Sequence, residues 1–228
     1  MAAIVLIHGA YQGGWIWRPT ARLLRRQGYD VYAPTLDGCA ERAHQLRPGI
    51  TNHSHAEELA SLLEFEDLRD VTLVGTSTGG MVLTRLAELT RERIARLVLA
   101  DALALMNDER LADIVTRHNP VTNEVGTGPT RDDARDRLFA ELDEKTRDWA
   151  LERYTLHPIA VMHSAVQLDS FWEQSWQARV IWCKHSANPP RAHQERAARK
   201  LNADWHELDS GHYPMLQTPA ALAKLISN

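Results

Sequence analysis

The chain has 228 residues, of which 44% are hydrophobic, and this suits one compact domain with a sizeable core. Its formal net charge of -4 shows no excess of basic groups, so we expect neither a nucleic-acid partner nor binding to an anionic membrane. Cys39 and Cys183 lie far apart without metal-ligand spacing, which argues against a disulfide scaffold and a zinc site. A small-molecule ligand and a reducing cytoplasm fit this composition best.

The chain opens on an apolar run, residues 2–7, that is too short for a signal sequence or a membrane span and predicts a strand. Similar short runs recur between longer amphipathic stretches, which is the pattern of parallel strands joined by crossover helices. Ser54 and Glu57 have the spacing of a capping box, so a helix is predicted from Ser54 to about Phe65. The six predicted strands are 4–7, 30–33, 71–74, 97–100, 179–183 and 205–208.

The alternation of strands and helices stops between residues 102 and 177, where the chain becomes polar and helical. We interpret this segment as a helical cap inserted after the fourth strand of a single domain over residues 1–228. Trp172 and Trp176 would share one face of a cap helix, where they either line an apolar substrate pocket or pack the cap on the core. The fold prediction is a mainly parallel α/β sheet of about six strands, flanked by helices and covered by this cap.

The strongest chemical signal is the stretch Gly-Thr-Ser-Thr-Gly at residues 75–79, between the third strand and the helical segment that starts at Met81. A nucleophilic serine needs a sharp strand-to-helix turn, and small residues two positions before and after it relieve the crowding of that turn. The turn also places the hydroxyl near a helix N-terminus, where free amides favour developing negative charge. Ser77 is therefore the candidate nucleophile.

Two further loops follow strands at the same edge of the predicted sheet. After the first strand, Ala10 is expected to lie beside the Ser77 turn, so that its amide and that of Thr78 hold an oxyanion. His8 is interpreted as a buried residue that orients this loop, and Tyr11 as a candidate pocket residue. After the sixth strand, His212 lies on a loop that can reach the serine, which makes it the candidate general base.

These motifs resemble the α/β-hydrolase superfamily, and within it the small bacterial esterases related to plant methylesterases and hydroxynitrile lyases. The resemblance rests on residues 7–15, 41–44, 75–79 and 211–216, and it extends over nearly the whole chain. It implies the α/β-hydrolase fold and the catalytic pair already inferred from the residues. It implies little about the substrate, because that superfamily includes esterases, lactonases, amidases, lyases and hormone receptors.

The catalytic acid is not where this group usually carries it. The usual position follows the fifth strand, but the loop 184–190 has no carboxylate, and Ser186 or Asn188 would orient the imidazole only as neutral groups. Asp101 ends the fourth strand beside the elbow, where some lactone-, halide- and amide-cleaving members carry their acid. We predict Asp101 as the acid; the alternatives are a neutral residue of the loop and Asp209.

The sequence thus predicts a serine hydrolase that cleaves a carboxylic ester, a lactone or a related acyl bond through an acyl-enzyme, with no cofactor and no metal. A hydroxynitrile-lyase-like reaction is disfavoured, because such enzymes carry a threonine where this chain has Gly9 or Ala10. A catalytically silent small-molecule receptor is the other alternative, which the missing carboxylate after the fifth strand supports. The substrate and the formation of a homodimer are left open.

Overall fold

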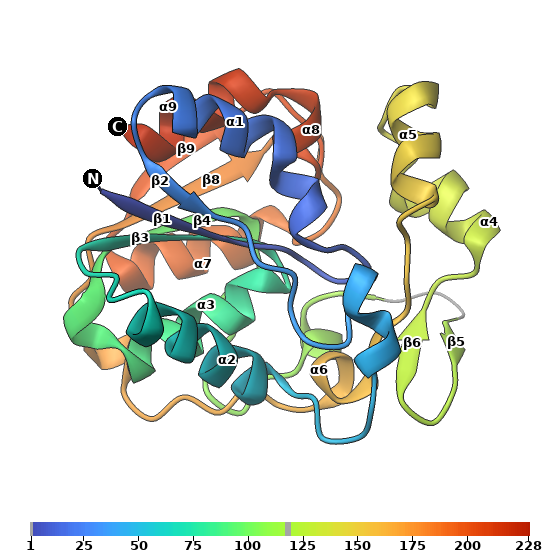
Figure 1. The fold of residues 1–228 in the computed structure, drawn as a ribbon, viewed down its shortest axis with the longest axis horizontal. Helices are drawn as coiled ribbons and strands as arrows, with labels where there is room; N and C mark the ends of the chain where they lie inside the picture. Colours follow the sequence, from blue (N-terminus) through green and yellow to red (C-terminus); the bar gives the residue numbers. More distant parts are fainter. Residues whose placement is uncertain (1, 117–119) are drawn as a thin grey trace.

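The computed structural model describes residues 2–116 and 120–228. Within them, six parallel strands form a twisted sheet in the order β2-β1-β3-β4-β8-β9, with helices on both faces (Figure 1). Every strand predicted from the sequence is present, and the parallel α/β architecture is confirmed. The strands are β1 (Ala3–Ile7), β2 (Asp30–Tyr32), β3 (Val71–Ser77), β4 (Ile94–Ala102), β8 (Ala178–Cys183) and β9 (Asp204–Leu208).

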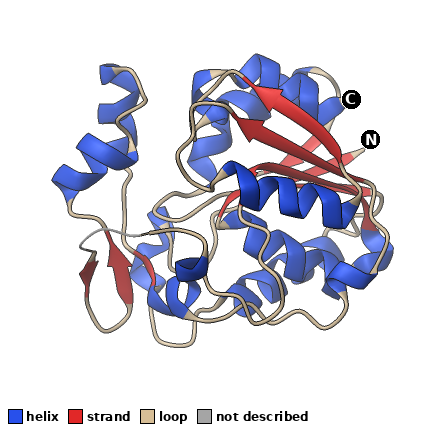
Figure 2. Ribbon diagram, turned by 180° about the vertical axis from the view of Figure 1, so that it is seen from behind, coloured by secondary structure: helices blue, strands red, loops and turns tan. Residues whose placement is uncertain are grey.

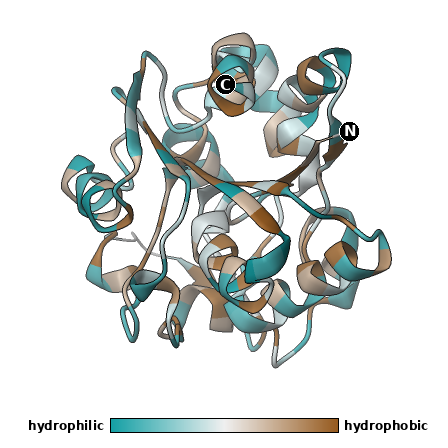
Figure 3. Cartoon of the chain, turned by 90° about the vertical axis from the view of Figure 1, so that its left-hand side faces the viewer, coloured by the Kyte–Doolittle hydropathy of each residue, from teal (hydrophilic) through white to brown (hydrophobic). Residues whose placement is uncertain are grey.

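Successive side chains of the buried strands point to opposite faces of the sheet, so each face carries its own apolar cluster. In β1, Val5 and Ile7 belong to one cluster, and Ile4 and Leu6 belong to the other. Figure 3 shows the apolar colouring of strands that cross the middle of the molecule. The first cluster packs under α2 (Asn52–Phe65), α3 (Gly79–Leu89) and α7 (Arg191–Leu201), and the second under α1 (Arg18–Arg26), α8 (Pro214–Gln217) and α9 (Pro219–Ser227).

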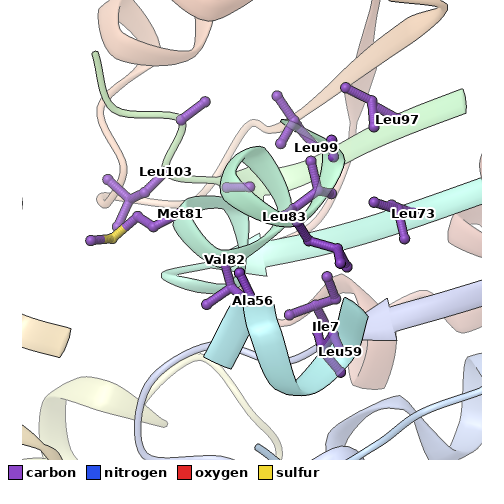
Figure 4. Packing of buried hydrophobic residues seen from close by; sticks show 14 of the residues in the cluster. Ile7, Ala56, Leu59, Leu73, Met81, Val82, Leu83, Leu97, Leu99 and Leu103 are labelled. Carbon is purple, nitrogen blue, oxygen red and sulfur yellow. The ribbon is translucent and has the colours of Figure 1, made fainter. Parts of the chain in front are cut away.

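The packing of α3 on the sheet fixes the turn that precedes this helix. Met81 and Leu83 of α3 lie in the same buried cluster as Leu73 of β3 and Leu59 of α2 (Figure 4). All of these side chains are fully or almost fully buried. Burial of each contributes roughly 1.5–3 kcal/mol relative to exposure, so the first turn of α3 has little freedom to move.

Helix α2 begins earlier than the sequence predicted. Its N-cap is Thr51, whose hydroxyl accepts from the Ser54 amide at 3.1 Å, while the Ser54 hydroxyl accepts from the Thr51 amide at 2.8 Å. Ser54 is thus the third helical residue and the reciprocal partner in the capping box. The prediction of Ser54 as N-cap with Glu57 as its partner is wrong by one turn, whereas the helix end at Phe65 agrees.

The segment between β4 and β8 covers the carboxyl ends of the strands, at the end of the molecule opposite both chain termini (Figures 1 and 2). It is not purely helical as predicted, because it contains a small antiparallel sheet in the order β5-β6-β7. Strands of two or three residues are too short to produce a readable alternation. Residues 117–119 of the predicted cap, including His118, lie outside the described residues. The cap elements are β5 (Val121–Thr122), β6 (Gly126–Gly128), α4 (Arg131–Asp133), α5 (Glu144–Leu151), β7 (His157–Pro158) and α6 (Ile159–His163).

Both cysteines are buried free thiols in this fold. Burial raises the pKa of Cys39 and of Cys183, so neither forms a reactive thiolate near neutral pH. Throughout the described residues, no helix has the length and apolar character needed to cross a membrane.

Candidate active site

The strand-to-helix turn at Ser77 has the geometry that a nucleophile requires. Strand β3 ends at Ser77 and α3 begins at Gly79, and Ser77 has a positive φ of 49°, in the left-handed region that non-glycine residues rarely adopt. A Cβ on Gly75 would lie 2.9 Å from the Gly79 carbonyl oxygen, and one on Gly79 would lie 2.6 Å from the carbonyl oxygen of Ile7. Glycine is therefore needed on both sides of Ser77: at Gly75 because the turn itself is crowded, as the sequence suggested, and at Gly79 because the backbone at Ile7 lies close.

The loop after β1 lies directly against Ser77. A Cβ on Gly9 would lie 2.7 Å from the Cβ of Ser77, so only glycine lets the two backbones approach this closely. His8 holds the loop from behind: its Nε2 accepts from the Leu36 amide at 3.0 Å, and its Nδ1 lies 2.8 Å from the Gly9 carbonyl oxygen. Burial lowers the pKa of His8 to about 4, so the ring stays neutral and has the structural part predicted for it.

A β-bulge directs Asp101 towards His212. In the β3–β4 ladder Thr76 pairs with Ala100 and Ser77 with Ala102, which leaves Asp101 as an extra residue with a positive φ of 49°. Such bulges redirect a side chain, and aspartate tolerates the left-handed conformation better than most residues. The Asp101 side chain is fully buried, and its Oδ2 lies 2.6 Å from Nδ1 of His212. The structure thus brings the two predicted residues together.

The other oxygen of Asp101 is also hydrogen-bonded. Oδ1 accepts from Nε2 of Gln194 at 2.8 Å and from the Cys183 amide at 3.4 Å. Both oxygens of this buried carboxyl group therefore have hydrogen-bond partners. Gln194, on α7, is a supporting residue that the sequence analysis missed, because no local pattern marks a buried glutamine as the partner of a distant aspartate.

The other residues predicted to orient His212 do so less well. One makes a longer contact with the ring, and the other does not contact the ring. Ser186 Oγ lies 3.5 Å from Nδ1 of His212, and its hydroxyl donates to the Asn188 carbonyl oxygen at 3.0 Å. Asp209 pairs instead with His185 at 2.8 Å, on the exposed surface. The shorter, charge-assisted contact to Asp101 is therefore the one that orients the ring.

The Asp101 contact determines where His212 carries its proton. A buried carboxylate only accepts hydrogen bonds, so Nδ1 of the neutral imidazole must be the donor. Nε2 is then unprotonated and has a lone pair. This is the tautomer that a general base needs.

A cavity of about 250 Å³ opens at this edge of the sheet, between the core and the cap. Its wall includes both members of the proposed serine–histidine pair and both proposed oxyanion residues, Ser77, His212, Ala10 and Thr78. Tyr11 also lines it, as predicted, with its ring 5.8 Å from that of Tyr154 of the cap. The rest of the wall comes mainly from residues that the sequence did not single out, among them Leu103, Leu111, Val115, Asp133, Arg137, Leu138, Glu141 and Met162.

Trp172 and Trp176 do not line this cavity. Their segment forms only one 3₁₀ turn, Phe171–Glu173, so the two rings do not share a helix face. The indole of Trp172 donates to the Leu105 carbonyl oxygen at 3.0 Å, and that of Trp176 donates to the Phe171 carbonyl oxygen at 2.9 Å. The pocket role predicted for them is wrong, and the alternative, packing of the cap on the core, is the one observed.

Within the described residues, no three His, Cys, Asp or Glu side chains are grouped as metal ligands. Residues 4–225 match the alpha/beta hydrolase family. With the elbow, the strand order and the aspartate–histidine pair on the same scaffold, the chain belongs to the α/β-hydrolase family. The family resemblance stated from the motifs is thereby confirmed.

Two curated relatives show which members of the family the chain is similar to. Over 120 residues, it is 39% identical to a carbendazim hydrolyzing esterase of Nocardioides sp. strain SG-4G, covering 53% of this chain and 50% of the relative. Over 111 residues, it is 30% identical to a chloroplastic protein of Arabidopsis thaliana provisionally named methylesterase 11, covering 48% of this chain and 28% of the relative. The matched part is thus half the length of these relatives or less. The expected relation to plant methylesterases is confirmed.

A solved structure covers the whole fold. It is an extracellular alpha/beta-hydrolase from a Paenibacillus species, described as sharing structural and functional homology with tobacco salicylic acid binding protein 2. The superposition has a TM-score of 0.84 at 20% sequence identity and covers 99% of this chain and 98% of that one. At this identity the likeness establishes the fold, including the cap, and not the substrate.

Proposed function

We propose that the chain is a serine hydrolase that cleaves a carboxylic ester of a small molecule through an acyl-enzyme. The observation that carries the proposal is the 2.6 Å contact between the buried carboxylate of Asp101 and Nδ1 of His212, beside a cavity that His212 lines together with Ser77. Similarity to a named esterase supports the class of bond.

In the proposed mechanism, the Ser77 oxygen attacks the ester carbonyl carbon while Nε2 of His212 takes the hydroxyl proton. The negative charge that develops on the carbonyl oxygen is held by the amides of Ala10 and Thr78. His212 then returns its proton to the leaving alcohol, and the acyl group stays on Ser77. A water molecule, deprotonated by the same imidazole, releases the acid and restores the serine.

Asp101 supports both steps without exchanging a proton itself. It accepts the Nδ1–H bond in the resting enzyme and stabilises the imidazolium that forms when Nε2 takes up a proton. The receptor alternative drew its support from the absence of a carboxylate in the loop 184–190. A carboxylate from β4 in contact with His212 supports catalysis instead.

The apolar part of the cavity wall supports a small ester that carries an apolar group. Leu103, just after β4, and Leu138 and Met162 of the cap supply apolar surface, and three prolines extend it. Small-molecule sites generally combine such walls with a few polar groups that orient the reacting bond. A lactone presents the same acyl chemistry and belongs to the same proposal.

The test is Ser77→Ala, assayed on a p-nitrophenyl ester of a short acid. We expect loss on the order of 10⁶ in kcat, the cost of removing a triad nucleophile, with an unchanged melting temperature. A fluorophosphonate should label Ser77, and a chelator in the assay should leave the rate unchanged.

Ser186→Ala is the matched control, because this second serine lies 3.5 Å from the same imidazole but has no nucleophilic part in the proposal. A kcat loss of only a hundredfold or less in Ser77→Ala, or a labelled peptide that does not contain Ser77, would refute the proposed mechanism.

A further inference from the structure

The cap rests directly on the loop that carries the proposed base. Glu141, in the turn that precedes α5, accepts the backbone N–H of His212 through its Oε2 at 2.7 Å. Its own carbonyl oxygen accepts from Nε2 of Gln217 at 3.0 Å. Two residues before Glu141, the buried ring of Phe139 packs 5.2 Å from the buried ring of Tyr213. The cap therefore contacts the histidine loop at His212 itself and at two residues that follow it.

Gly211 is shaped to receive the Glu141 carboxylate. A Cβ on Gly211 would lie 1.6 Å from Oε2 of Glu141. Gly211 does not have a positive φ, so it is the space and not the backbone conformation that calls for glycine here. Gln217 completes the support, because its Oε1 accepts from the Gly211 amide and from the Ser210 hydroxyl, both at 3.0 Å.

The Glu141 carboxylate contacts the histidine loop. Glu141 forms no ion pair with any other described residue, although Arg137, one turn earlier in the cap, lines the same cavity. A hydrogen bond from a backbone amide to a carboxylate is stronger than one to a neutral acceptor. Around His212, Asp101 and Ser186 approach Nδ1 from the core, while Glu141 approaches the backbone amide from the cap.

We propose that Glu141 is a positioning residue that ties the cap to the catalytic base. Asp101 sets the direction of the imidazole ring, and Glu141 sets the place of the backbone from which that ring projects. Because Glu141 also lines the cavity, the same residue links the part of the cap that encloses the substrate to the alignment of Nε2 with Ser77. This inference rests on the proposed function of His212.

The experiment compares Glu141→Ala, Glu141→Gln, Gly211→Ala and the double variant Glu141→Ala with Gly211→Ala. Glu141→Ala should lower kcat about tenfold, the effect of one charge-assisted hydrogen bond, and should change KM less than threefold. Glu141→Gln keeps an acceptor oxygen and should recover most of the rate. In Gly211→Ala the new methyl displaces the carboxylate, so this variant should lose as much as Glu141→Ala, and the double variant should lose no more than either.

Glu144→Ala is the matched control, an exposed acidic residue three positions along the cap at the start of α5. It should leave kcat, KM and melting temperature unchanged. An unchanged kcat in Glu141→Ala, no rescue by Glu141→Gln, or additive losses near a hundredfold in the double variant would each overturn the proposal.

A readout without turnover keeps the two proposals apart. In ¹⁵N-labelled protein, the His212 amide proton should move upfield in Glu141→Ala and in Gly211→Ala, because the charged acceptor is lost, and it should stay in place in Glu144→Ala. If no ester is cleaved but the amide shift follows this pattern, the contact is real and the proposed function fails. If esters are cleaved and the amide does not move, the positioning role fails.

Discussion

Replacement of Asp101 by asparagine is the most informative change, because it alters one atom in a buried group. Oδ1 of Asp101 accepts from Gln194 and from the Cys183 amide, so the oxygen of the new amide will stay on that side. Its NH₂ group must then face Nδ1 of His212. Since an amide NH₂ donates, Nδ1 has to become the acceptor, and the imidazole proton moves to Nε2. The ring then has no lone pair to offer Ser77.

The expected loss is on the order of 10⁴ in kcat, the effect of the same change in a Ser-His-Asp triad. This corresponds to about 5.4 kcal/mol of transition-state stabilisation. KM should change little, because Asp101 does not line the cavity. The melting temperature should fall only slightly, because the size of the side chain and the hydrogen bonds to Oδ1 are preserved.

The assay measures kcat and KM on a p-nitrophenyl ester, with the concentration of active sites counted by a fluorophosphonate. Ser186→Ala and Asn188→Ala are the controls and should stay within about threefold, since the hydroxyl of Ser186 makes at most a long contact with the ring. The reverse ranking, or a loss below tenfold in Asp101→Asn, would refute the assignment and favour a dyad oriented by the loop 184–190.

Three further predictions follow from the same site. Gln194→Leu removes the 2.8 Å donor to Asp101 and should lower the free energy of unfolding by roughly 1–3 kcal/mol and kcat about tenfold; unchanged values in urea titrations and rate assays would contradict the role given to Gln194. Gly79→Ala puts a methyl group 2.6 Å from backbone oxygens and should cost roughly 1–3 kcal/mol of stability, read from the melting temperature; a melting temperature like that of the wild type would mean that the elbow relaxes. The pKa of His8 is about 4 in the folded protein and 6.5 for an ordinary imidazole, so the unfolded chain binds the proton more readily. The stability that neutral His8 contributes is therefore complete above pH 6.5 and is lost as the pH falls towards 4. The loss from His8 should reach about 1.4 kcal/mol by pH 5.5, and burial, which lowers the pKa of His193 to about 4, adds a loss of the same sign. Urea midpoints that do not differ between pH 7.5 and pH 5.5 would rule this out.

The sheet and the elbow could be predicted from the sequence because their signals are local. Buried parallel strands such as β1 and β4 are continuous apolar runs bounded by turns, and they need no distant partner to be recognised. The need for glycine at Gly75 is also local, because a Cβ there would lie 2.9 Å from the Gly79 carbonyl oxygen, whereas Gly79 is constrained by the distant backbone of Ile7. His212 could be predicted too, because in a parallel sheet the loops after successive strands meet at one edge.

The sequence pattern of the cap is weaker, and it did not predict the small antiparallel sheet. Strands β5 and β7 have only two residues each, which is less than one repeat of the alternation that identifies a strand. Trp172 and Trp176 have helical spacing in the sequence, but their segment forms a single 3₁₀ turn. Residues four positions apart share a face only where the segment is helical, and this segment packs against the core without forming an α-helix.

The contacts of Asp101 and of Glu141 with the histidine loop depend on the tertiary structure. The sequence favours Asp101 over Asp209 and the neutral residues of the loop 184–190, but it carries no sign of the β-bulge that turns Asp101 towards His212. Glu141 lies 71 residues before the amide that it accepts, and nothing near it in the chain marks this role. Both contacts join segments that become neighbours only when β4, the cap and the histidine loop pack at one edge of the sheet. The directions of these side chains depend on that packing, which local patterns do not encode.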